Sequence, residues 1–394
     1  MTQYILHIGY GKTGTTALQR FLASNREELR ERGILYPDAK VNGVWLGSFD
    51  HNMVARALVG RLGWWNTSLE AYLSQFEEQC RSTGAHTVIL SAESFMGFLQ
   101  PWDFDSADAY WHALGNNAAH LAKILEGHQI TIVVYLRRQD HWMDSAINQT
   151  IKYGGLLDDG AARWPTEILV EKYAPRLDYA RCLDAWAQAF PSATVKVGVY
   201  ERGQLNDHGI VEDFFSLIRL PSDGLKREVF NDAERNFRLS RDVLEVKRIL
   251  NRVERPKYEE RVLAACLRDI SAEMGNANDD WPLLTTAQRE ALAQKFASSN
   301  ADVARRYLGR DDGILFKEPN PSAQPENEAY PGLRIEAALE IIMRADRYMS
   351  SFSVRLQMFR HWAAEILRKN VPVLHGFARL LRMVMEKAIK RQSV

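Results

Sequence analysis

The chain begins with a pattern that strongly constrains its fold: an apolar strand, a loop rich in glycine and threonine, and a helix. Residues 4–8 (YILHI) are mainly apolar, Gly9–Thr16 contain one lysine, and a helical pattern starts at Thr15. Glycines let a loop curl closely, and backbone N–H groups at a helix start favour an anion. The pattern predicts a phosphate site at the end of the first strand; the alternative is a strand–helix turn without a ligand.

The position of the lysine distinguishes this loop from a Walker A loop. Walker A has the pattern GxxxxGK[ST]. If Gly11, Lys12 and Thr13 were its last three residues, position 6 would be glycine, but it is leucine. The lysine also stands ahead of the Gly14-Thr15-Thr16 step. The sequence therefore predicts a shorter phosphate loop of another type.

A second phosphate motif follows another apolar run. Residues 130–136 read ITIVVYL, which is typical of a buried parallel strand, and Arg137 and Arg138 come directly after it. Ser145 lies eight residues beyond Arg137, in a stretch with a helical pattern. Arginine donates forked hydrogen bonds to phosphate oxygens and serine adds a neutral donor.

Together these motifs resemble sulfotransferases that use 3′-phosphoadenosine 5′-phosphosulfate (PAPS). GYGKTGTTAL is similar to the loop of the carbohydrate and heparan N-sulfotransferase branch, and TVKVGVYERGQL (194–205) resembles a late Tyr-Glu-x-Leu segment of that family. The resemblance implies that Lys12 stabilises the leaving phosphate oxygen. It further implies a 5′-phosphate site formed by Gly11, Thr13, Gly14, Thr15 and Thr16, and a 3′-phosphate site formed by Arg137 and Ser145. Because the family arginine usually precedes Asp-Pro or Asn-Pro, whereas Arg138-Gln139 stands here, Arg138 remains an alternative ligand.

The expected fold is a three-layer α/β domain of the P-loop type with a central parallel sheet. Apolar runs at 4–8, 86–91, 130–136 and 194–200 predict buried strands, separated by helical stretches at 15–32, 69–83, 116–127, 142–153 and 177–190. Such alternation indicates a parallel sheet with helices on both faces. We expect this domain over residues 1–315, a linker rich in proline and asparagine at 316–332, and a helical extension at 333–394.

The general base that sulfuryl transfer to a hydroxyl requires has two candidates. His51 precedes a helical stretch, and Glu93 follows the strand at 86–91. Histidine and carboxylates are the usual bases, and the two could act together. The alternatives are a capping or core role for His51 and a helix N-cap role for Glu93. Trp45, Trp64, Trp65, Trp102 and Trp111 could stack on sugars, so we expect a carbohydrate or glycolipid acceptor, with a hydroxyl favoured over an amine.

Composition narrows the class of partner. The 394 residues carry a formal net charge of +0, which argues against a nucleic-acid partner. The three cysteines are far apart, no metal motif is present, and no signal peptide or membrane span is expected, so the sequence predicts a cytoplasmic protein without a metal. Residues 331–394 hold 12 Lys and Arg against 5 Asp and Glu. Their helices either pack on the domain or a second subunit, or contact an anionic membrane surface.

Two other functions remain open. Residues 86–93 read HTVILSAE, which could imitate a Walker B strand, so a metal-dependent P-loop kinase or NTPase is the first alternative. The second is a non-catalytic nucleotide-binding scaffold with a basic tail on a membrane.

Overall fold

The computed structural model describes most of the chain, in segments that leave gaps. They are residues 2–38, 40–41, 44–45, 49–60, 69–154, 163–206, 209–227, 238–274, 281–319, 330–351, 354–355 and 358. The chain divides into two units. Unit 1 holds residues 1–146, 166–236 and 284–327, and unit 2 holds residues 147–165, 237–283 and 328–394.

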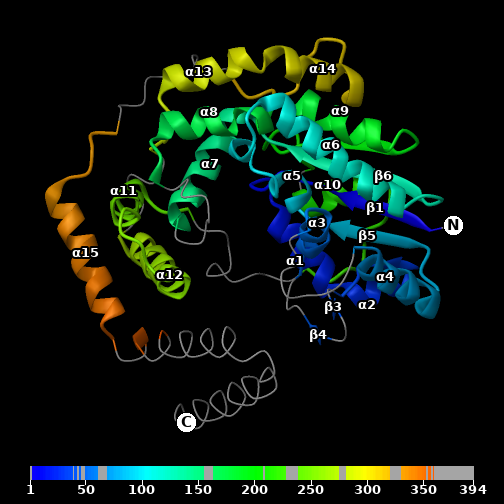
Figure 1. Ribbon diagram of the computed structural model, residues 1–394, viewed down its shortest axis with the longest axis horizontal. Helices are drawn as coiled ribbons and strands as arrows, with labels where there is room; N and C mark the ends of the chain where they lie inside the picture. Colours follow the sequence, from blue (N-terminus) through cyan, green and yellow to red (C-terminus); the bar gives the residue numbers. More distant parts are fainter. Residues whose placement is uncertain are drawn as a thin grey trace, which may run out of the picture. The chain divides into compact units, whose positions relative to one another are not determined.

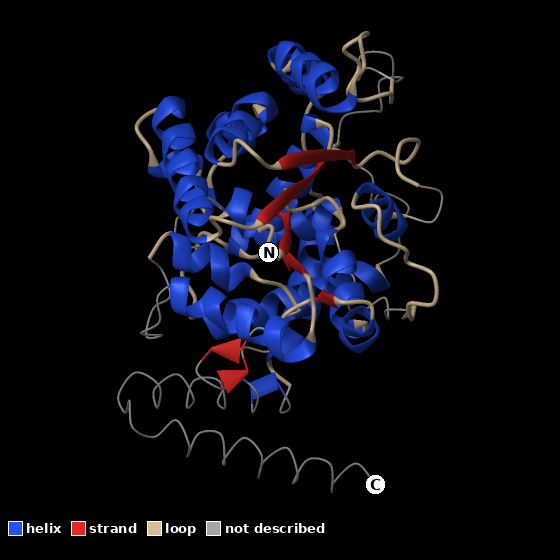
Figure 2. Cartoon of the chain, turned by 90° about the vertical axis from the view of Figure 1, so that its right-hand side faces the viewer, coloured by secondary structure: helices blue, strands red, loops and turns tan. Residues whose placement is uncertain are grey.

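Unit 1 is built on a five-stranded parallel sheet with the order β2-β5-β1-β6-β7 (Figures 1 and 2). Its strands are β1 (Gln3–His7), β2 (Ile34–Leu35), β5 (Thr87–Ser91), β6 (Gln129–Leu136) and β7 (Thr194–Val199). The predicted α/β class and parallel sheet are confirmed, and β2 is an additional, short strand. The strands β2 and β5 lie on one side of β1, and the later strands β6 and β7 lie on the other. The strand order therefore changes direction at β1, and in such sheets ligands bind at the carboxyl ends of the strands at this point.

Both faces of the sheet are buried, as expected for parallel strands. Ile5, Ile89, Val133 and Tyr135 form one face and pack in a hydrophobic core with α1, α2 and α10. The alternate residues Tyr4, Leu6 and others are also fully buried, on the opposite face. These helices are α1 (Thr15–Ser24), α2 (Arg26–Glu31) and α10 (Ile210–Leu217).

The remaining helices of unit 1 complete its outer layers (Figure 1). They are α3 (Asn52–Leu58), α4 (Leu69–Thr83), α5 (Ser94–Gly97), α6 (Ala107–Ile124), α7 (Gln139–Lys152, whose last turns belong to unit 2), α8 (Thr166–Leu177), α9 (Tyr179–Ala189), α13 (Thr286–Lys295) and α14 (Ala297–Leu308). A short 3₁₀ helix spans Pro101–Asp103, and β3 (Lys40–Val41) pairs antiparallel with β4 (Val44–Trp45).

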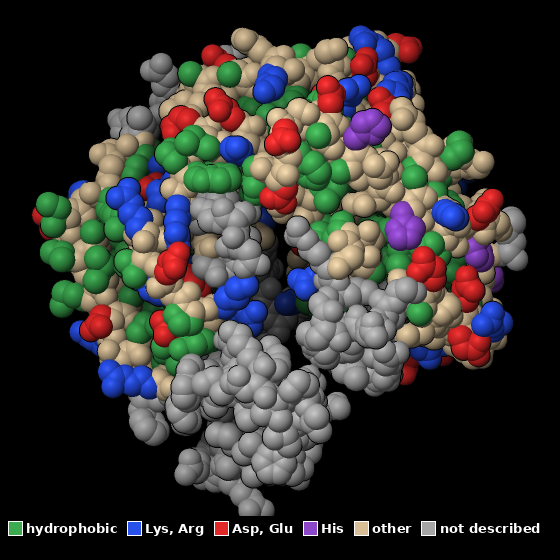
Figure 3. All heavy atoms as spheres, in the orientation of Figure 1, with side chains coloured by type: hydrophobic (Ala, Val, Ile, Leu, Met, Phe, Trp, Pro, Cys, Tyr) green, Lys and Arg blue, Asp and Glu red, His purple; other side chains and the backbone are tan. Residues whose placement is uncertain are grey.

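Unit 2 is helical in its described residues. It contains α11 (Arg241–Leu250), α12 (Lys257–Glu273) and α15 (Ile335–Met349). Lys247 on α11 and Glu260 on α12 form a buried ion pair with Nζ and Oε2 2.6 Å apart. Apolar side chains are exposed along α15, where Figure 3 shows them gathered.

No helix of the described residues is long and apolar enough to cross a membrane. The helical extension predicted at 333–394 includes α15, which packs against α11 and α12 in unit 2, whereas the residues from 359 onward lie outside the described residues. Its two predicted roles therefore stay predictions.

Candidate functional site

The glycine- and threonine-rich loop lies between β1 and α1 at the carboxyl edge of the sheet. Lys12 and Gly14 both adopt left-handed backbone conformations, with φ of 74° and 76°. Glycine suits this region, whereas a lysine there is uncommon and indicates a backbone shape imposed by its surroundings. A Cβ atom at Gly14 would also lie 3.0 Å from the Tyr200 ring, so only glycine fits without strain. The first turn of α1 begins directly after this loop, at Thr15.

Three side chains donate hydrogen bonds to the carbonyl groups of the loop, two of them from elsewhere in unit 1 and one from the loop itself. Trp142 on α7 donates from Nε1 to the Gly11 carbonyl at 2.8 Å. Arg137, just beyond β6, donates from Nη1 to the Lys12 carbonyl at 3.1 Å. The buried Thr13 hydroxyl donates to the Tyr10 carbonyl at 2.5 Å. The loop is thus held in place by hydrogen bonds that its carbonyl oxygens accept from Trp142, Arg137 and Thr13.

The two predicted phosphate motifs meet. Arg137 Nη1 donates both to the Lys12 carbonyl and to Ser145 Oγ, at 3.1 and 3.0 Å. The Tyr179 hydroxyl donates to the Arg137 carbonyl at 2.6 Å, and the Arg137 guanidinium lies 5.8 Å from the Tyr200 ring centre. Loop, arginine and serine therefore form one cluster at the carboxyl ends of β1 and β6.

Arg138 is engaged elsewhere, although the sequence left it as an alternative phosphate ligand. It is 9% exposed and donates to both carboxylate oxygens of Asp140, at 2.7 and 2.9 Å. Burial alone would raise the pKa of Asp140, but the hydrogen bonds from Arg138 and the nearby charges of His141 and Arg289 lower it. This geometry favours Arg137 as the residue that faces the loop.

Glu93 lies at the loop and is one of the two candidate bases. It follows β5, and its Oε2 accepts a hydrogen bond from the Thr15 hydroxyl at 2.6 Å. The same oxygen is 3.6 Å from the position that a Cβ atom would take on Gly11. The sequence placed Glu93 at a strand end, and the structure brings it to the loop.

His51 is the other candidate base, and it is fully buried. Its Nδ1 accepts from the Ser91 backbone N–H at 3.0 Å, and its Nε2 therefore carries the proton and donates to the Pro37 carbonyl at 3.1 Å. Burial lowers the pKa of His51 to about 4, despite the opposing effect of the Pro37 hydrogen bond. Both ring nitrogens are occupied, so this geometry gives His51 a positioning role beside β5.

His7, at the end of β1, was not singled out by the sequence. Its Nδ1 lies 2.7 Å from Ser91 Oγ, and its buried Nε2 has no hydrogen-bond partner among the described residues. Burial lowers the pKa of His7 to about 4. His7 and His51 therefore both contact Ser91 as buried rings whose low pKa keeps them neutral at pH 7.

These histidines predict that the protein loses stability in acid. Each histidine has a pKa of about 4 in the folded protein, against the ordinary value of 6.5 for a histidine exposed to water. Between pH 4 and pH 6.5 the unfolded chain therefore binds more protons than the folded protein. The contribution present above pH 6.5 is thus lost as the pH falls toward 4. In urea unfolding across this window, we expect His51→Gln to lower the slope of unfolding free energy against pH by up to one proton, about 1.4 kcal/mol per pH unit. An unchanged slope would contradict the neutral, buried state of His51.

Of the five tryptophans that the sequence offers for stacking on sugars, the structure describes the side chains of Trp102 and Trp111. Trp111 donates from Nε1 to the Pro175 carbonyl and carries the Arg181 guanidinium over its ring, and Trp102 packs edge-on against Tyr173. Both are thus part of contacts within the protein. Trp64, Trp65 and the side chain of Trp45 lie outside the described residues.

The sequence predicts a protein without a metal, with three cysteines that are far apart. The described residues contain no group of three or more His, Cys, Asp or Glu side chains that could hold a metal ion. Cys80, Cys182 and Cys266 are buried free thiols.

Comparison with known proteins gives one distant relative. No family model matches the chain, and no solved structure matches it. An uncharacterized protein of Archaeoglobus fulgidus is 25% identical over 236 residues, which cover 60% of this chain and 62% of that protein. The chain therefore spans less than two thirds of the length of this relative.

Proposed function

We propose that this protein is a PAPS-dependent sulfotransferase with a P-loop-type domain, acting on a hydroxyl of a carbohydrate or glycolipid. The observation that carries the proposal is the double hydrogen bond of Arg137, which joins the Lys12 carbonyl to the Ser145 hydroxyl. A nucleotide with phosphates at both its 5′ and 3′ positions needs two anion sites within one ligand's reach. A loop with a helix N-terminus beside an Arg–Ser pair supplies them.

In the proposed reaction, the acceptor oxygen attacks sulfur in line with the leaving phosphate. The new O–S bond forms as the bond between sulfur and the 5′-phosphate oxygen breaks, and that oxygen leaves with the electron pair. Lys12 stabilises the negative charge that develops there, and Glu93 takes the proton of the acceptor hydroxyl. Glu93 is preferred to His51 because it lies at the loop, whereas both nitrogens of His51 are hydrogen-bonded.

We expect Arg137→Ala to weaken the binding of 3′-phosphoadenosine 5′-phosphate about 10- to 100-fold, because charge-assisted hydrogen bonds of about 1.5–3 kcal/mol are lost. Isothermal titration calorimetry measures this change. Arg81→Ala is the control, since Arg81 is exposed on α4 and pairs only locally with Glu78. Equal affinity of Arg137→Ala and the wild type would remove Arg137 from the proposed nucleotide site.

One observation favours a metal-dependent kinase or NTPase as the second candidate. P-loop enzymes hold Mg²⁺ with a loop Ser or Thr and a carboxylate at the end of a neighbouring strand. Thr15 at the start of α1 and Glu93 after β5 are such a pair, 2.6 Å apart. The lysine position in the loop argues against it.

Thermal-shift measurements separate the two candidates. Stabilisation by 3′-phosphoadenosine 5′-phosphate without metal favours the sulfotransferase, and stabilisation only by ATP with Mg²⁺ favours the kinase or NTPase. Transfer of label from PAPS to a glycan or glycolipid acceptor would then exclude the non-catalytic scaffold.

A further inference from the structure

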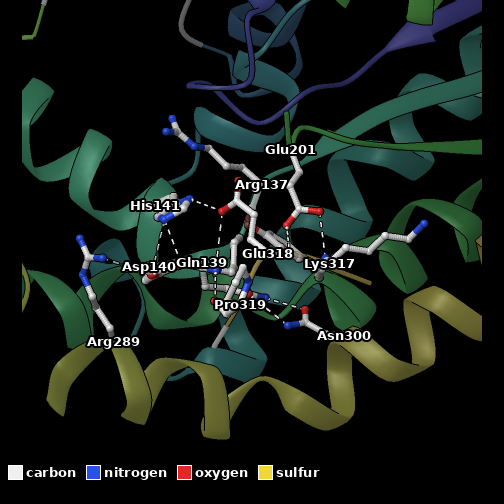
Figure 4. Close-up of polar contacts among 12 residues, drawn as sticks. Arg137, Gln139, Asp140, His141, Glu201, Arg289, Asn300, Lys317, Glu318 and Pro319 are labelled. Atoms are coloured by element: carbon white, nitrogen blue, oxygen red, sulfur yellow. Dashed lines mark hydrogen bonds and ion pairs between the residues drawn. The ribbon is translucent and has the colours of Figure 1, made fainter. Parts of the chain in front are cut away.

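Residues 315–319 are bound along the edge of unit 1, although the sequence predicts that 316–332 are a linker. Glu201 lies just beyond β7 and is 5% exposed. Its two carboxylate oxygens accept from the backbone N–H groups of Lys317 and Glu318, at 2.9 and 2.8 Å. Gln204 donates to the Leu315 carbonyl at 3.0 Å and also to Glu201. Figure 4 shows Glu318 and Pro319 between Glu201 on one side and Asp140 and His141 on the other.

Arg138 holds the far end of the same stretch. Its Nη1 donates to the Pro319 carbonyl at 2.9 Å, in addition to the paired hydrogen bonds with Asp140. Burying a carboxylate and a guanidinium costs free energy unless both are well satisfied. Here the backbone of residues 315–319 satisfies a large share of these requirements, so the stretch is a specific part of the fold.

The side chain of Glu318 extends the network to His141. Arg138 Nη2 lies 2.9 Å from His141 Nε2 and can only donate, so this nitrogen accepts. The proton of the neutral ring is then on Nδ1, which lies 3.3 Å from Glu318 Oε2 (Figure 4). Glu318 and Arg138 thus fix the tautomer of His141 from two sides.

This network adjoins the proposed phosphate ligand. Arg138 follows Arg137 directly, and Tyr179 holds the Arg137 carbonyl between them. The backbone at Arg137 is therefore restrained by the hydrogen bond from Tyr179 and by the next residue, Arg138, which donates to the Pro319 carbonyl. A displacement of about 1 Å in a residue that positions a ligand can greatly lower affinity or rate. The attachment of residues 315–319 to Arg138 and Glu201 therefore affects how precisely Arg137 is placed.

We propose that residues 315–319 form a strap that positions Arg137 for the nucleotide, with Glu201 and Arg138 as positioning residues. The inference rests on the proposed function only for the identity of the ligand at Arg137. The effect of the strap is on nucleotide affinity, through the geometry of Arg137.

The test uses the full chain with Glu201→Ala and the milder Glu201→Gln, which retains one carbonyl oxygen as an acceptor. Glu318→Ala is the matched control, because it removes only the contacts of that carboxylate and keeps both backbone N–H groups on Glu201. Hydrogen–deuterium exchange without nucleotide reports on the strap, and calorimetry with 3′-phosphoadenosine 5′-phosphate reports on Arg137.

We expect faster exchange of residues 315–319 and about 10-fold weaker binding in Glu201→Ala, with a smaller change in Glu201→Gln and the smallest in Glu318→Ala. Unchanged exchange in Glu201→Ala would overturn the strap. Faster exchange with unchanged affinity, while Arg137→Ala loses affinity, would overturn the positioning role and leave the proposed function standing. No binding by the wild type would instead overturn the proposed function, and the nucleotide role of the strap with it. If Glu201→Ala does not fold, Glu201→Gln decides between these outcomes.

Discussion

Lys12→Ala is expected to lower the turnover of sulfuryl transfer by ~10²–10³, the loss typical for one preorganised donor at a developing charge. The substitution leaves the loop itself largely unchanged. Alanine, like lysine, carries a Cβ atom, so the left-handed backbone at φ 74° is about as strained after the substitution as before it. The carbonyl of residue 12 can still accept from Arg137. The change therefore removes the ammonium group and little else.

Steady-state kinetics at saturating PAPS measure this effect, together with the melting temperature of each variant. Lys12→Arg should recover part of the rate because the positive charge is retained, and Lys123→Ala on the exposed side of α6 serves as the control. Full activity of Lys12→Ala would remove Lys12 from the proposed chemistry. A parallel fall in melting temperature would assign the loss to folding.

Lys247→Met is expected to destabilise unit 2 by about 3–5 kcal/mol, because it leaves Glu260 buried without its main partner. Lys247 and Glu260 are 0% and 2% exposed, and Arg255 approaches Glu260 only to 3.5 Å. Lys247 Nζ also donates to Asn251, whose amide donates to the Ile151 carbonyl at 2.8 Å. Burial lowers the pKa of Lys247, against the effect of Glu260. The pair thus connects α11, α12 and the end of α7 within unit 2.

The double variant Lys247→Met/Glu260→Leu should recover much of this loss, since removing both charges also removes the desolvation cost. Urea unfolding followed by circular dichroism, with amide exchange in α11 and α12, measures both changes. Arg344→Ala is the control, because its exposed pairs with Glu340 and Glu273 each contribute less than about 1 kcal/mol. A loss as small for Lys247→Met as for this control would contradict the role assigned to the buried pair.

The main strands could be predicted because they are continuous apolar runs, and β1, β5, β6 and β7 lie where those runs do. Short or interrupted elements gave weaker signals. The helix expected over 15–32 is divided at Asn25, whose amide donates to the Phe21 carbonyl and to Lys226 far along the chain. β2 has two residues and no periodicity of its own. Residues 237–283 group with α15 in unit 2, a long-range association that local patterns do not encode.

The motifs singled out Lys12, Arg137 and Ser145 by their spacing, and the structure brings Arg137 to the Lys12 carbonyl and to Ser145, while their binding roles stay predictions. The residues that brace it were not. Trp142 and Tyr179 act on the loop and on Arg137 through single polar atoms, across 131 and 42 residues of sequence. Glu201 binds backbone groups, which have no sequence signature at all. His51 precedes a helix in sequence, and only its buried hydrogen bonds distinguish a positioning ring from a base.

The carbonyl braces on the loop have a thermodynamic consequence. Trp142, Arg137 and the Thr13 hydroxyl restrain Gly11, Lys12 and Tyr10 before a ligand arrives. If the loop binds the proposed nucleotide, little backbone entropy remains to be lost on association, and affinity for the loop then depends mainly on the complementarity of the anion. On that proposal, even a small dianion that lacks the nucleoside is expected to bind with a modest entropic penalty.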